Sequence, residues 1–348
     1  MVKVVVDAMG GDNAPVEIIK GAVDALLKTD KEDLELIFTG SEEVIRRVLD
    51  DLRSDKDRKN YDNSRITIVN TTEVIETGEP PVAAIRAKKD SSMVVALKMV
   101  KEGKADAFVS SGSTGAILVG GQVIVGKLKG VKRTPLAPVI PTMNGGALLI
   151  DCGANVDARP EYLVQYAHMG SIYMKYVCGV ENPKVGILNI GAEEEKGNAL
   201  VKETYPLLKA EEDINFIGGI ESKDMIEGKA DVIVCDAFSG NIALKTYEAT
   251  GSVLLGMLKT TLTDGLKNKI GAAIVYPALK SKLKKFDATQ YGGAPMLGLK
   301  GLVVKTHGSA KAKEIGNAVL QCLDFSKEDI PGKISKAFNK QTQTAQEE

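Results

Sequence analysis

Short apolar runs alternate along the chain with longer segments that have the periodicity of a helix. The short runs are rich in β-branched residues and are typical of strands: Val4–Val6, Leu34–Phe38, Ile66–Val69, Ala107–Val109, Ala147–Ile150, Val185–Leu188, Asn215–Ile217, Val232–Val234 and Leu302–Val304. Between them, apolar residues recur at helical spacing, for example in Val16–Lys28, Glu42–Leu52, Ser91–Glu102 and Tyr162–Val177. This alternation predicts βαβ units.

The predicted strands are continuously apolar, which is typical of strands covered on both faces. We therefore expect an α/β fold with a mainly parallel sheet flanked by helices, an α/β/α arrangement. The 348 residues are enough for one large α/β domain or for two lobes. We expect a single catalytic unit over residues 1–338, with a solvated connection at 50–65 and a flexible tail at 339–348.

Polar loops that contain glycine follow six of the predicted strands. They begin at Asp7, Ser110, Asp151, Asn189, Cys235 and Lys305. Ligands of open parallel sheets bind at the carboxyl ends of the strands, so we expect all six loops at one edge. Helix capping and turns explain any one of these loops. Together they indicate an anion site, where backbone N–H groups at helix N-termini supply positive charge.

The loop "SSGSTGA" at residues 110–116 is the best candidate for binding an anion. Ser113 and Thr114 offer hydroxyls, and the glycines beside them let a ligand approach the backbone. A near match to a P-loop at residues 121–127 is followed by Leu128 instead of Ser or Thr, so we do not interpret it as a nucleotide site. No Gly-x-Gly-x-x-Gly fingerprint opens a helix, and we expect neither a nicotinamide nor any other cofactor.

The usual nucleophiles and bases are poorly represented. The chain has no Gly-x-Ser-x-Gly elbow and only two histidines. His168 lies on a predicted helix and is expected to be structural, whereas His307 follows a strand, and both a structural and a functional role are open for it. Few acid–base groups beside many anion-binding groups suggest a nucleophile that already carries its charge.

Composition narrows the function classes further. Hydrophobic residues make up 44% of the chain, charged residues 26%, and the net charge is −1, so we expect an ordinary soluble protein with no nucleic-acid partner. The four cysteines form no close pair, which argues against a zinc or redox motif, and Cys152 and Cys235 are expected to be buried reduced thiols. No apolar run reaches the roughly 18 residues of a membrane span, and no signal peptide precedes the first strand, which predicts a cytoplasmic location.

Residues 251–286 have a different pattern. Apolar residues recur every four positions, at Leu254, Leu258, Leu262, Leu266, Ile270 and Ile274. Between residues 259 and 285 there is one acid, Asp264, and there are seven lysines: Lys259, Lys267, Lys269, Lys280, Lys282, Lys284 and Lys285. The segment is either a core or dimer helix pair with a solvated basic face, or an element that contacts an anionic membrane or an acidic partner. The two interpretations are compatible.

Several stretches carry a resemblance to a known family. They are "VVVDAMGGDNAP" (4–15), "VSSGSTGA" (109–116), "PTMNGGALLIDCGANVD" (141–157), "VGILNIGAEEEKGN" (185–198), "DVIVCDAFSGNIALK" (231–245) and "THGSA" (306–310). They resemble the PlsX family, the phosphate acyltransferases of bacterial phospholipid synthesis, and they cover nearly the whole chain.

The resemblance implies a fold similar to phosphate acetyltransferases and isocitrate/isopropylmalate dehydrogenases. It implies a reaction in which acyl-[acyl-carrier protein] and inorganic phosphate give acyl phosphate and free carrier protein. It also implies a homodimer that associates peripherally with the inner face of the cell membrane through a projecting helical region, which matches residues 251–286. The acyl phosphate would then serve a membrane glycerol-phosphate acyltransferase, whose frequent His-x4-Asp signature this chain lacks.

Acyl transfer to phosphate also fits the residues. Phosphate is an oxyanion nucleophile that needs orientation more than a strong base, and the thioester carbonyl needs hydrogen-bond donors where negative charge develops. The candidate catalytic residues are Lys196, Asn198, Asn155, Asn189, His307 and Lys245. The candidate phosphate- and substrate-binding residues are Asp7, Gly10, Gly11, Asp12, Asn13, Ser111, Ser113, Thr114, Gly115, Asp151, Asp236, Ser239, Gly240 and Asn241. The candidate membrane or carrier-protein contacts are Leu254, Leu258, Leu262, Lys259, Lys267, Lys269 and Ile274.

Within these sets we expect different roles. Lys196 or Lys245 would neutralise charge, the three asparagines of the catalytic set would donate to the oxyanion, and His307 would polarise phosphate or the carbonyl. The four aspartates would orient Lys, Asn and backbone groups, because carboxylates repel phosphate. Three rival functions are a phosphate transacylase that uses acyl-coenzyme A, a decarboxylating dehydrogenase and a non-catalytic membrane-recruited scaffold. The dehydrogenase would need a carboxylate cluster and a nicotinamide site, which the sequence does not offer, and the scaffold leaves the six loops unexplained.

Overall fold

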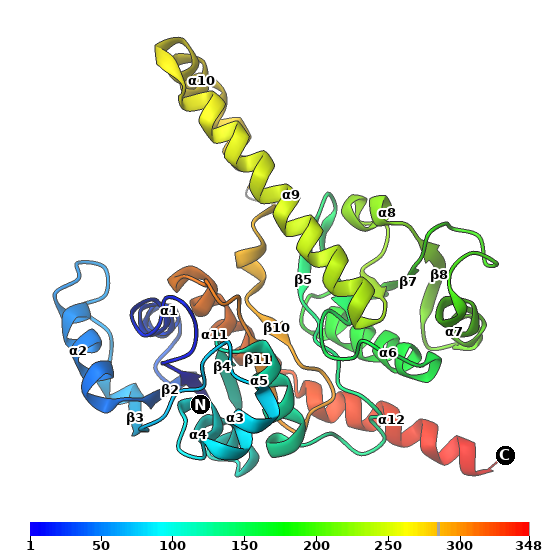
Figure 1. The fold of residues 1–348 in the computed structure, drawn as a ribbon, viewed down its shortest axis with the longest axis horizontal. Helices are drawn as coiled ribbons and strands as arrows, with labels where there is room; N and C mark the ends of the chain where they lie inside the picture. Colours follow the sequence, from blue (N-terminus) through cyan, green and yellow to red (C-terminus); the bar gives the residue numbers. More distant parts are fainter. Residues whose placement is uncertain (284–285, 348) are drawn as a thin grey trace. The chain divides into compact units, whose positions relative to one another are not determined.

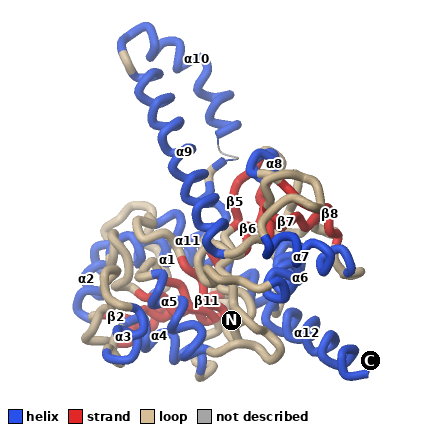
Figure 2. The backbone as a smooth tube through the Cα atoms, turned by 45° about the vertical axis from the view of Figure 1, so that its right-hand side comes forward, coloured by secondary structure: helices blue, strands red, loops and turns tan. Residues whose placement is uncertain are grey.

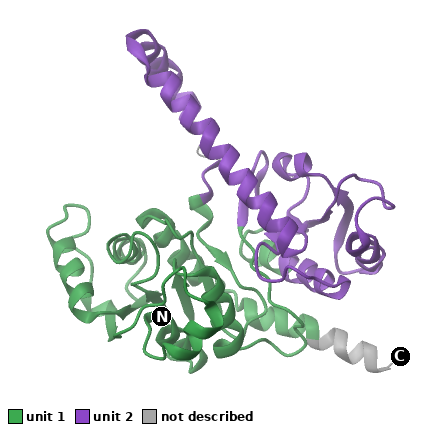
Figure 3. Ribbon diagram, in the orientation of Figure 1, with its two compact units in different colours: residues 1–138, 172–180, 289–348 green, residues 139–171, 181–288 purple. Residues whose placement is uncertain are grey.

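The computed structural model describes residues 1–283 and 286–347, and the chain divides into two compact units (Figure 3). Unit 1 comprises residues 1–138, 172–180 and 289–348, and unit 2 comprises residues 139–171 and 181–288. Each unit has its own sheet with flanking helices, which confirms the expected α/β class. The sequence predicts that residues 1–338 act as one catalytic unit. This stays a prediction, because it concerns how the two compact units act together.

Unit 1 contains a six-stranded sheet in the order β10-β11-β4-β1-β2-β3. The strands are β1 (Val2–Asp7), β2 (Leu34–Gly40), β3 (Ile66–Asn70), β4 (Ala107–Ser110), β10 (Ala294–Pro295) and β11 (Leu302–Lys305). Neighbours are parallel except for β10 beside β11. Val6 pairs with Val109, and Ser110 pairs with Lys305, so β1, β4 and β11 end side by side.

Glycine residues, which have no side chain, let helices of unit 1 pack closely on one another. They are α1 (Val16–Leu27), α2 (Glu42–Arg53), α3 (Pro81–Ala87), α4 (Ser92–Lys101), α5 (Thr114–Gly120), α11 (Ala312–Lys327) and α12 (Ile330–Glu347), with short η1 (Asn63–Arg65) and η2 (Gly121–Val125). A Cβ atom on Gly21 of α1 would lie 2.3 Å from the Ala312 carbonyl oxygen of α11. The two backbones can therefore approach to a distance that a larger residue would prevent.

Unit 2 contains a five-stranded sheet in the order β5-β6-β9-β7-β8. The strands are β5 (Val139–Thr142), β6 (Gly145–Ile150), β7 (Lys184–Leu188), β8 (Asn215–Ile220) and β9 (Val232–Val234), and all neighbours are parallel except β5 and β6. The helices are α7 (Ala199–Ala210), α8 (Ser222–Glu227), α9 (Ala237–Thr263) and α10 (Gly265–Leu283), while α6 (Pro160–Tyr176) contains the boundary between the units and η4 (Ala288–Tyr291) follows α10.

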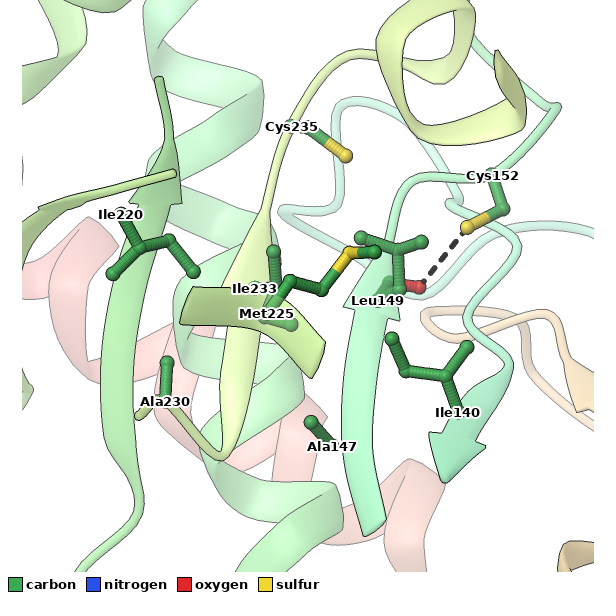
Figure 4. Packing of buried hydrophobic residues seen from close by; sticks show 9 residues of the cluster. All are labelled: Ile140, Ala147, Leu149, Cys152, Ile220, Met225, Ala230, Ile233 and Cys235. Carbon is green, nitrogen blue, oxygen red and sulfur yellow. Dashed lines mark hydrogen bonds between the residues drawn. The ribbon is translucent and has the colours of Figure 1, made fainter. Parts of the chain in front are cut away.

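Figure 4 shows the buried cluster on one face of the unit 2 sheet. It consists of Ile140, Ala147, Leu149, Cys152, Ile220, Met225, Ala230, Ile233 and Cys235. Cys152 and Cys235 are buried and free, as the sequence predicts, and burial raises the pKa of both thiols well above its ordinary value. They are small apolar residues of the core.

All the strands predicted from the sequence are present, whereas β5 and β10 were missed. Both are short antiparallel edge strands that contain proline, at Pro141 and Pro295, and proline weakens a strand pattern. The connection predicted at 50–65 is mostly exposed, although α2 extends to Arg53 and Tyr61 is buried with its hydroxyl donating to the Leu49 carbonyl at 2.9 Å. Helix α12 runs to Glu347, and the flexibility expected for 339–348 stays a prediction.

Helices α9 and α10 form an antiparallel hairpin (Figures 1 and 2). The chain turns at Asp264 and Gly265, and Gly265 has a φ of +73° that favours glycine. The expected helical pattern is present up to Thr263 and over Gly265–Leu283, but the stripe expected over 254–274 is wrong as a single face because the turn divides it between two helices. Lys284 and Lys285 lie outside the described residues.

Apolar side chains are exposed around these two helices instead of along one line. Val253, Leu254, Leu255 and Met257 on α9 are exposed, as are Leu266, Ile270, Ile274, Val275 and Tyr276 on α10. Neighbouring positions on a helix point about 100° apart, so these side chains cannot share one face. Across residues 1–283 and 286–347, no helix combines the length and the apolarity needed to cross a membrane.

A glycine in the first turn of α9 permits a close contact that the fold of unit 2 requires. A Cβ atom on Gly240 would lie 1.9 Å from the Asp151 carbonyl oxygen, whereas one on Gly256 of the same helix would meet no atom within 4 Å. Gly240→Ala should therefore lower the free energy of unfolding by about 1–3 kcal/mol or more, because a backbone carbonyl cannot rotate away. Gly256→Ala should leave it unchanged or raise it by about 0.5–1 kcal/mol. Urea unfolding of both variants measures this difference, and equal stabilities would contradict the close contact.

Candidate functional site

The six polar loops lie on two sheets, not on the single edge expected from the sequence. The loops after β1, β4 and β11 belong to unit 1, and those after β6, β7 and β9 belong to unit 2. The strands of both sheets are short apolar runs in the sequence, so the alternation of strands and helices could not show that they form two sheets. Each loop does follow the carboxyl end of a parallel strand, where ligands of such sheets bind.

A buried carboxylate organises the unit 1 edge. Asp7 is 1% exposed, and its Oδ2 accepts a hydrogen bond of 2.7 Å from the Ser110 hydroxyl. The same hydroxyl oxygen accepts from the Gly112 N–H at 2.9 Å, so Asp7 holds the start of the 110–116 loop. Burial raises the pKa of Asp7 above its usual value, while hydrogen bonds from Ser92 and Ser110 oppose the shift. Asp7 faces the loop backbone and not solvent.

The opening turn, which follows β1, also contacts the loop after β11. A Cβ atom on Gly10 would lie 2.5 Å from Asp7 Oδ2, and Gly11 has a φ of +107°. The Asp12 N–H donates to the Gly308 carbonyl at 2.8 Å, and the Asn13 amide donates to the Ser309 carbonyl at 2.9 Å. This turn therefore aligns the loop after β1 with the loop after β11.

The hydroxyls of the 110–116 loop differ in accessibility. The Ser111 hydroxyl is buried and lies 2.6 Å from the Thr306 hydroxyl. Ser113 is also buried, and its oxygen caps α5 by accepting from the Ala116 N–H at 3.4 Å. Thr114 is exposed, so a ligand can reach its hydroxyl more readily than those of the two serines. Gly115 is half-buried beside it, where a Cβ atom would lie 2.5 Å from Pro81.

The loop after β11 contributes a histidine and a lysine. His307 is exposed, with its Nδ1 2.8 Å from the Ser309 hydroxyl and its backbone N–H donating to Glu314 Oε1 at 2.8 Å. Lys305, the last residue of β11, is buried, and burial lowers the pKa of its ammonium to about 8. The set of candidate site residues omitted Lys305, although a lysine directly after an apolar strand was a visible signal.

A second buried carboxylate organises the unit 2 edge. Asp151 is fully buried, and its Oδ1 accepts from the Gly153 and Ala154 N–H groups at 3.1 and 3.0 Å. Its Oδ2 accepts from the Asn155 backbone at 2.9 Å and from the Asn155 side-chain amide at 2.8 Å. The Asn155 amide is therefore held by Asp151, and a role as an oxyanion donor stays a prediction.

Asp236 caps the N-terminus of α9. Its Oδ1 accepts from the Phe238 and Ser239 N–H groups at 3.0 and 2.9 Å, and its Oδ2 accepts from the Ser239 hydroxyl at 2.8 Å. One turn later, the Asn241 amide donates to the Cys152 carbonyl at 3.3 Å. The loops after β6 and β9 are thus joined by α9, and Lys245 is exposed further along that helix.

The loop after β7 is arranged around Asn189. This residue is 8% exposed, accepts from the Ile190 N–H at 2.8 Å and donates to the Lys196 carbonyl at 3.2 Å. The Lys196 ammonium is half-exposed and lies 2.7 Å from Glu193, whose hydrogen bond raises the pKa of the lysine. His168 of α6, expected to be structural, lies 2.9 Å from Glu211.

A pocket of about 350 Å³ opens at the unit 2 edge, a size within the range of small-ligand sites. Its lining comes from three loops and helix starts: Val156, Asp157, Ala158, Asn198, Leu200, Asp236, Phe238 and Ser239. Asn198 caps α7 by accepting from the Val201 N–H at 2.9 Å. Three of the predicted site residues therefore meet here, together with an apolar wall that includes Phe238, 61% exposed, which the sequence did not identify.

The chain matches a family described as "Fatty acid synthesis protein" over residues 2–333. It is 46% identical over 340 residues to a phosphate acyltransferase of Clostridium perfringens (strain ATCC 13124), covering 98% of both chains. It is 48% identical over 318 residues to a phosphate acyltransferase of Clostridium botulinum (strain Loch Maree), covering 91% of this chain and 92% of the relative.

Solved structures agree with the expected fold. The EutD phosphotransacetylase from Staphylococcus aureus is 19% identical, with a TM-score of 0.59 and coverage of 93% of this chain and 94% of that one. A phosphotransacetylase from Streptococcus pyogenes is 18% identical, with a TM-score of 0.60 and 94% coverage of both. These likenesses show the fold, and the sequence matches show the family. The chain therefore belongs to the fatty acid synthesis protein family, which confirms its resemblance to the PlsX phosphate acyltransferases, and it is an enzyme of the acyltransferase class.

Proposed function

We propose that the protein transfers an acyl group from acyl-carrier protein to inorganic phosphate, releasing acyl phosphate and free carrier protein for phospholipid synthesis. The observation that carries the proposal is the match over 98% of the chain to a protein named phosphate acyltransferase. The resemblance of the loop motifs to the PlsX family supports the carrier protein as donor. Acyl-coenzyme A is the alternative donor.

The proposed reaction has one bond formed and one broken at the thioester carbon. A phosphate oxygen attacks the carbonyl, negative charge develops on the carbonyl oxygen, and the C–S bond then breaks to release the thiolate. Hydrogen-bond donors directed at the carbonyl oxygen lower the barrier, and orientation of phosphate removes much of the entropic cost. The leaving thiol has a pKa of roughly 8.5 by analogy with Cys, so it departs with little protonation.

Unit 1 supplies the proposed phosphate contacts. The exposed Thr114 hydroxyl and the backbone N–H groups around Gly115 would bind phosphate, while Ser111 and Ser113 shape the loop from its buried side. His307 is exposed at the end of β11 and would polarise phosphate or the carbonyl. Asp7, Gly10, Gly11, Asp12 and Asn13 hold these loops together through the contacts described above.

The candidate acyl contacts are residues of unit 2, as is Lys196, a candidate for charge neutralisation. The pocket places Asn198 and Ser239 beside the apolar side chain of Phe238, a combination suited to a polar carbonyl attached to an alkyl chain. Lys196 would approach a bound anion by exchanging its bond to Glu193. Asn155, Asn189, Asn241 and Lys245 remain candidate donors, and Asp151, Asp236 and Gly240 keep their loops in place.

Substitution of Lys196 tests this charge assignment. Lys196→Ala should raise the KM for phosphate by about tenfold, because a charge-assisted contact is worth about one decade in affinity. Lys209→Ala is the matched control, since Lys209 is exposed and paired with Glu194 at 2.9 Å but is not among the candidate site residues. Initial rates at varied phosphate give both values, and an unchanged KM in Lys196→Ala would remove the residue from the proposal.

Substitution of Thr114 tests the unit 1 contact separately. Thr114→Ala should raise the KM for phosphate by about tenfold through the lost hydroxyl, with a smaller change in kcat. Thr114→Ser keeps the hydroxyl and should restore most of the affinity. Equal KM values for the wild type, Thr114→Ala and Thr114→Ser would show that phosphate does not contact this side chain.

The reaction itself is tested with purified protein and long-chain acyl-carrier protein. We expect thiol release that depends on phosphate, together with a product that hydroxylamine converts to a hydroxamate. Thiol release without phosphate would indicate a thioesterase, and a faster reaction with acyl-coenzyme A would favour the alternative donor. No release from folded protein with several chain lengths would favour the scaffold.

The α9–α10 hairpin is the proposed contact with an anionic membrane surface or with the carrier protein, in a cytoplasmic homodimer that binds the membrane peripherally. Leu254 and Ile274 are 59% and 77% exposed, and Lys259, Lys267 and Lys269 are exposed beside them. Leu258 and Leu262 are half-buried and suit packing within a helix pair. An apolar surface with adjacent lysines binds anionic interfaces through both burial and charge.

Vesicle binding tests the hairpin. The double substitution Leu254→Asn and Ile274→Asn should weaken binding to vesicles of phosphatidylcholine with phosphatidylglycerol about tenfold, because two apolar side chains no longer insert. Val123→Asn, at a residue 71% exposed in unit 1, is the control and should bind normally. Co-sedimentation gives the affinity and light scattering gives the mass. Unchanged vesicle binding with a loss of dimer mass would assign the hairpin to the dimer only.

A further inference from the structure

Lys305 is a buried lysine at the functional edge of unit 1 that no proposed role has used. It is the last residue of β11 and is 8% exposed. Its ammonium donates to the carbonyl of the next residue, Thr306, and among the described residues it forms no ion pair with a carboxylate. A buried ammonium with a single neutral acceptor is an uncommon arrangement that a core position does not explain.

Burial of this charge is unfavourable without an anionic partner. An ammonium removed from water loses several kcal/mol of hydration, by general estimates, and one carbonyl restores only part of it. Asp12 and Glu314 stand near enough to raise the pKa of Lys305 but are not bonded to it. Glu314 instead accepts from the His307 backbone N–H. These two carboxylates help the lysine keep its proton near neutral pH and leave ammonium donors for another acceptor.

The surroundings of Lys305 are those of the proposed phosphate loops. Ser110, the partner of Lys305 in the β4–β11 register, begins the 110–116 loop and binds Asp7. The Thr306 hydroxyl pairs with that of Ser111, and the Thr306 N–H donates to the Ser110 carbonyl at 3.0 Å. The lysine is therefore fixed to the same backbone segment that leads to Thr114.

We propose that Lys305 is the cation of unit 1 that binds the phosphate nucleophile, exchanging its bond to the Thr306 carbonyl for a phosphate oxygen. This inference rests on the proposed function for the choice of anion. A lysine suits the role because its ammonium is a compact charge with three donors on a flexible stem. A tetrahedral oxyanion bound there offsets the cost of the buried charge, which the Thr306 carbonyl alone does not.

Binding of phosphate without any acyl donor tests the inference. Lys305→Met keeps the length of the side chain and removes its charge, and it should weaken phosphate binding in calorimetry at least about tenfold. Lys300→Met, at an exposed lysine in the loop before β11, is the matched control and should bind as the wild type does. Equal phosphate affinities in Lys305→Met and the wild type would overturn the proposal.

Thermal unfolding without phosphate separates binding from folding. Replacement of an incompletely paired buried charge by an apolar side chain should leave the Tm unchanged or raise it. Phosphate should then raise the Tm of the wild type and of Lys300→Met but not of Lys305→Met. A lower Tm in Lys305→Met with a normal rise on adding phosphate would show a structural role and overturn the assignment.

Sulfate binding tests the charge of Lys305 without the protonation changes of phosphate, because sulfate keeps its charge from pH 6 to 10. The Lys305 ammonium is charged below its pKa of about 8 and neutral above it. Sulfate affinity of the wild type should therefore fall about tenfold between about pH 7 and 9, whereas that of Lys305→Met should be low and flat. A flat profile in the wild type would contradict the role of Lys305.

The phosphodiester of a pantetheine arm on the donor is the other source of the same anionic chemistry. Titration with free holo-carrier protein, whose arm is joined through that phosphodiester, distinguishes the sources, and loss of its affinity with unchanged phosphate affinity in Lys305→Met would overturn the assignment to the nucleophile. The proposed function is tested separately. If the protein binds phosphate through Lys305 but forms no hydroxylamine-reactive product, this inference stands and the proposed reaction is wrong.

Discussion

In both units, the loops at the edge of the sheet must surround a buried carboxylate with hydrogen-bond donors. Asp7 is the last residue of β1 and Asp151 directly follows β6, and each is almost completely removed from water. The donors that satisfy them come from the loops themselves: the Ser110 hydroxyl for Asp7, and the N–H groups of Gly153 and Ala154 for Asp151. The conformation of these loops therefore follows from the desolvation of a single charge in each unit.

The glycines of these loops are a consequence of the same constraint. Donors can surround a buried carboxylate only if the backbone comes very close, and a side chain at Gly10 would occupy the space beside Asp7 Oδ2. In unit 2, Gly240 lets the start of α9 approach the backbone carbonyl of Asp151. The polar loops can thus be compact and still leave a few groups, such as Thr114 and Phe238, facing outward.

The sequence predicts the elements better than their assembly. Short apolar runs marked all the parallel strands, because the residue types that a covered strand requires can be read from the local sequence. The division into two sheets was not predictable, since strand pairing is set by contacts between distant residues such as Lys305 with Ser110. The apolar stripe at 254–274 was divided for a local reason that periodicity does not show, the turn at Asp264 and Gly265.

The candidate site shows a similar limit. Residue type and position after a strand identified Asp7, Asp151 and Asp236, but not that Ser111 and Ser113 point inward while Thr114 is exposed. The sequence did not identify Lys305 as a site residue, because a lysine next to a strand is usually solvated and its burial depends on the tertiary structure. The apolar wall at Phe238 escaped because an aromatic in the first turn of a helix is usually part of the core.

The length of α9 gives unit 2 a mechanical property. Its 27 residues form one continuous rod of about 40 Å. One end is clamped by the Asp236 cap and carries Phe238 and Ser239 in the pocket, and the other end carries the exposed apolar hairpin. One continuous helix therefore joins the residues that line the pocket to the exposed apolar residues of the hairpin.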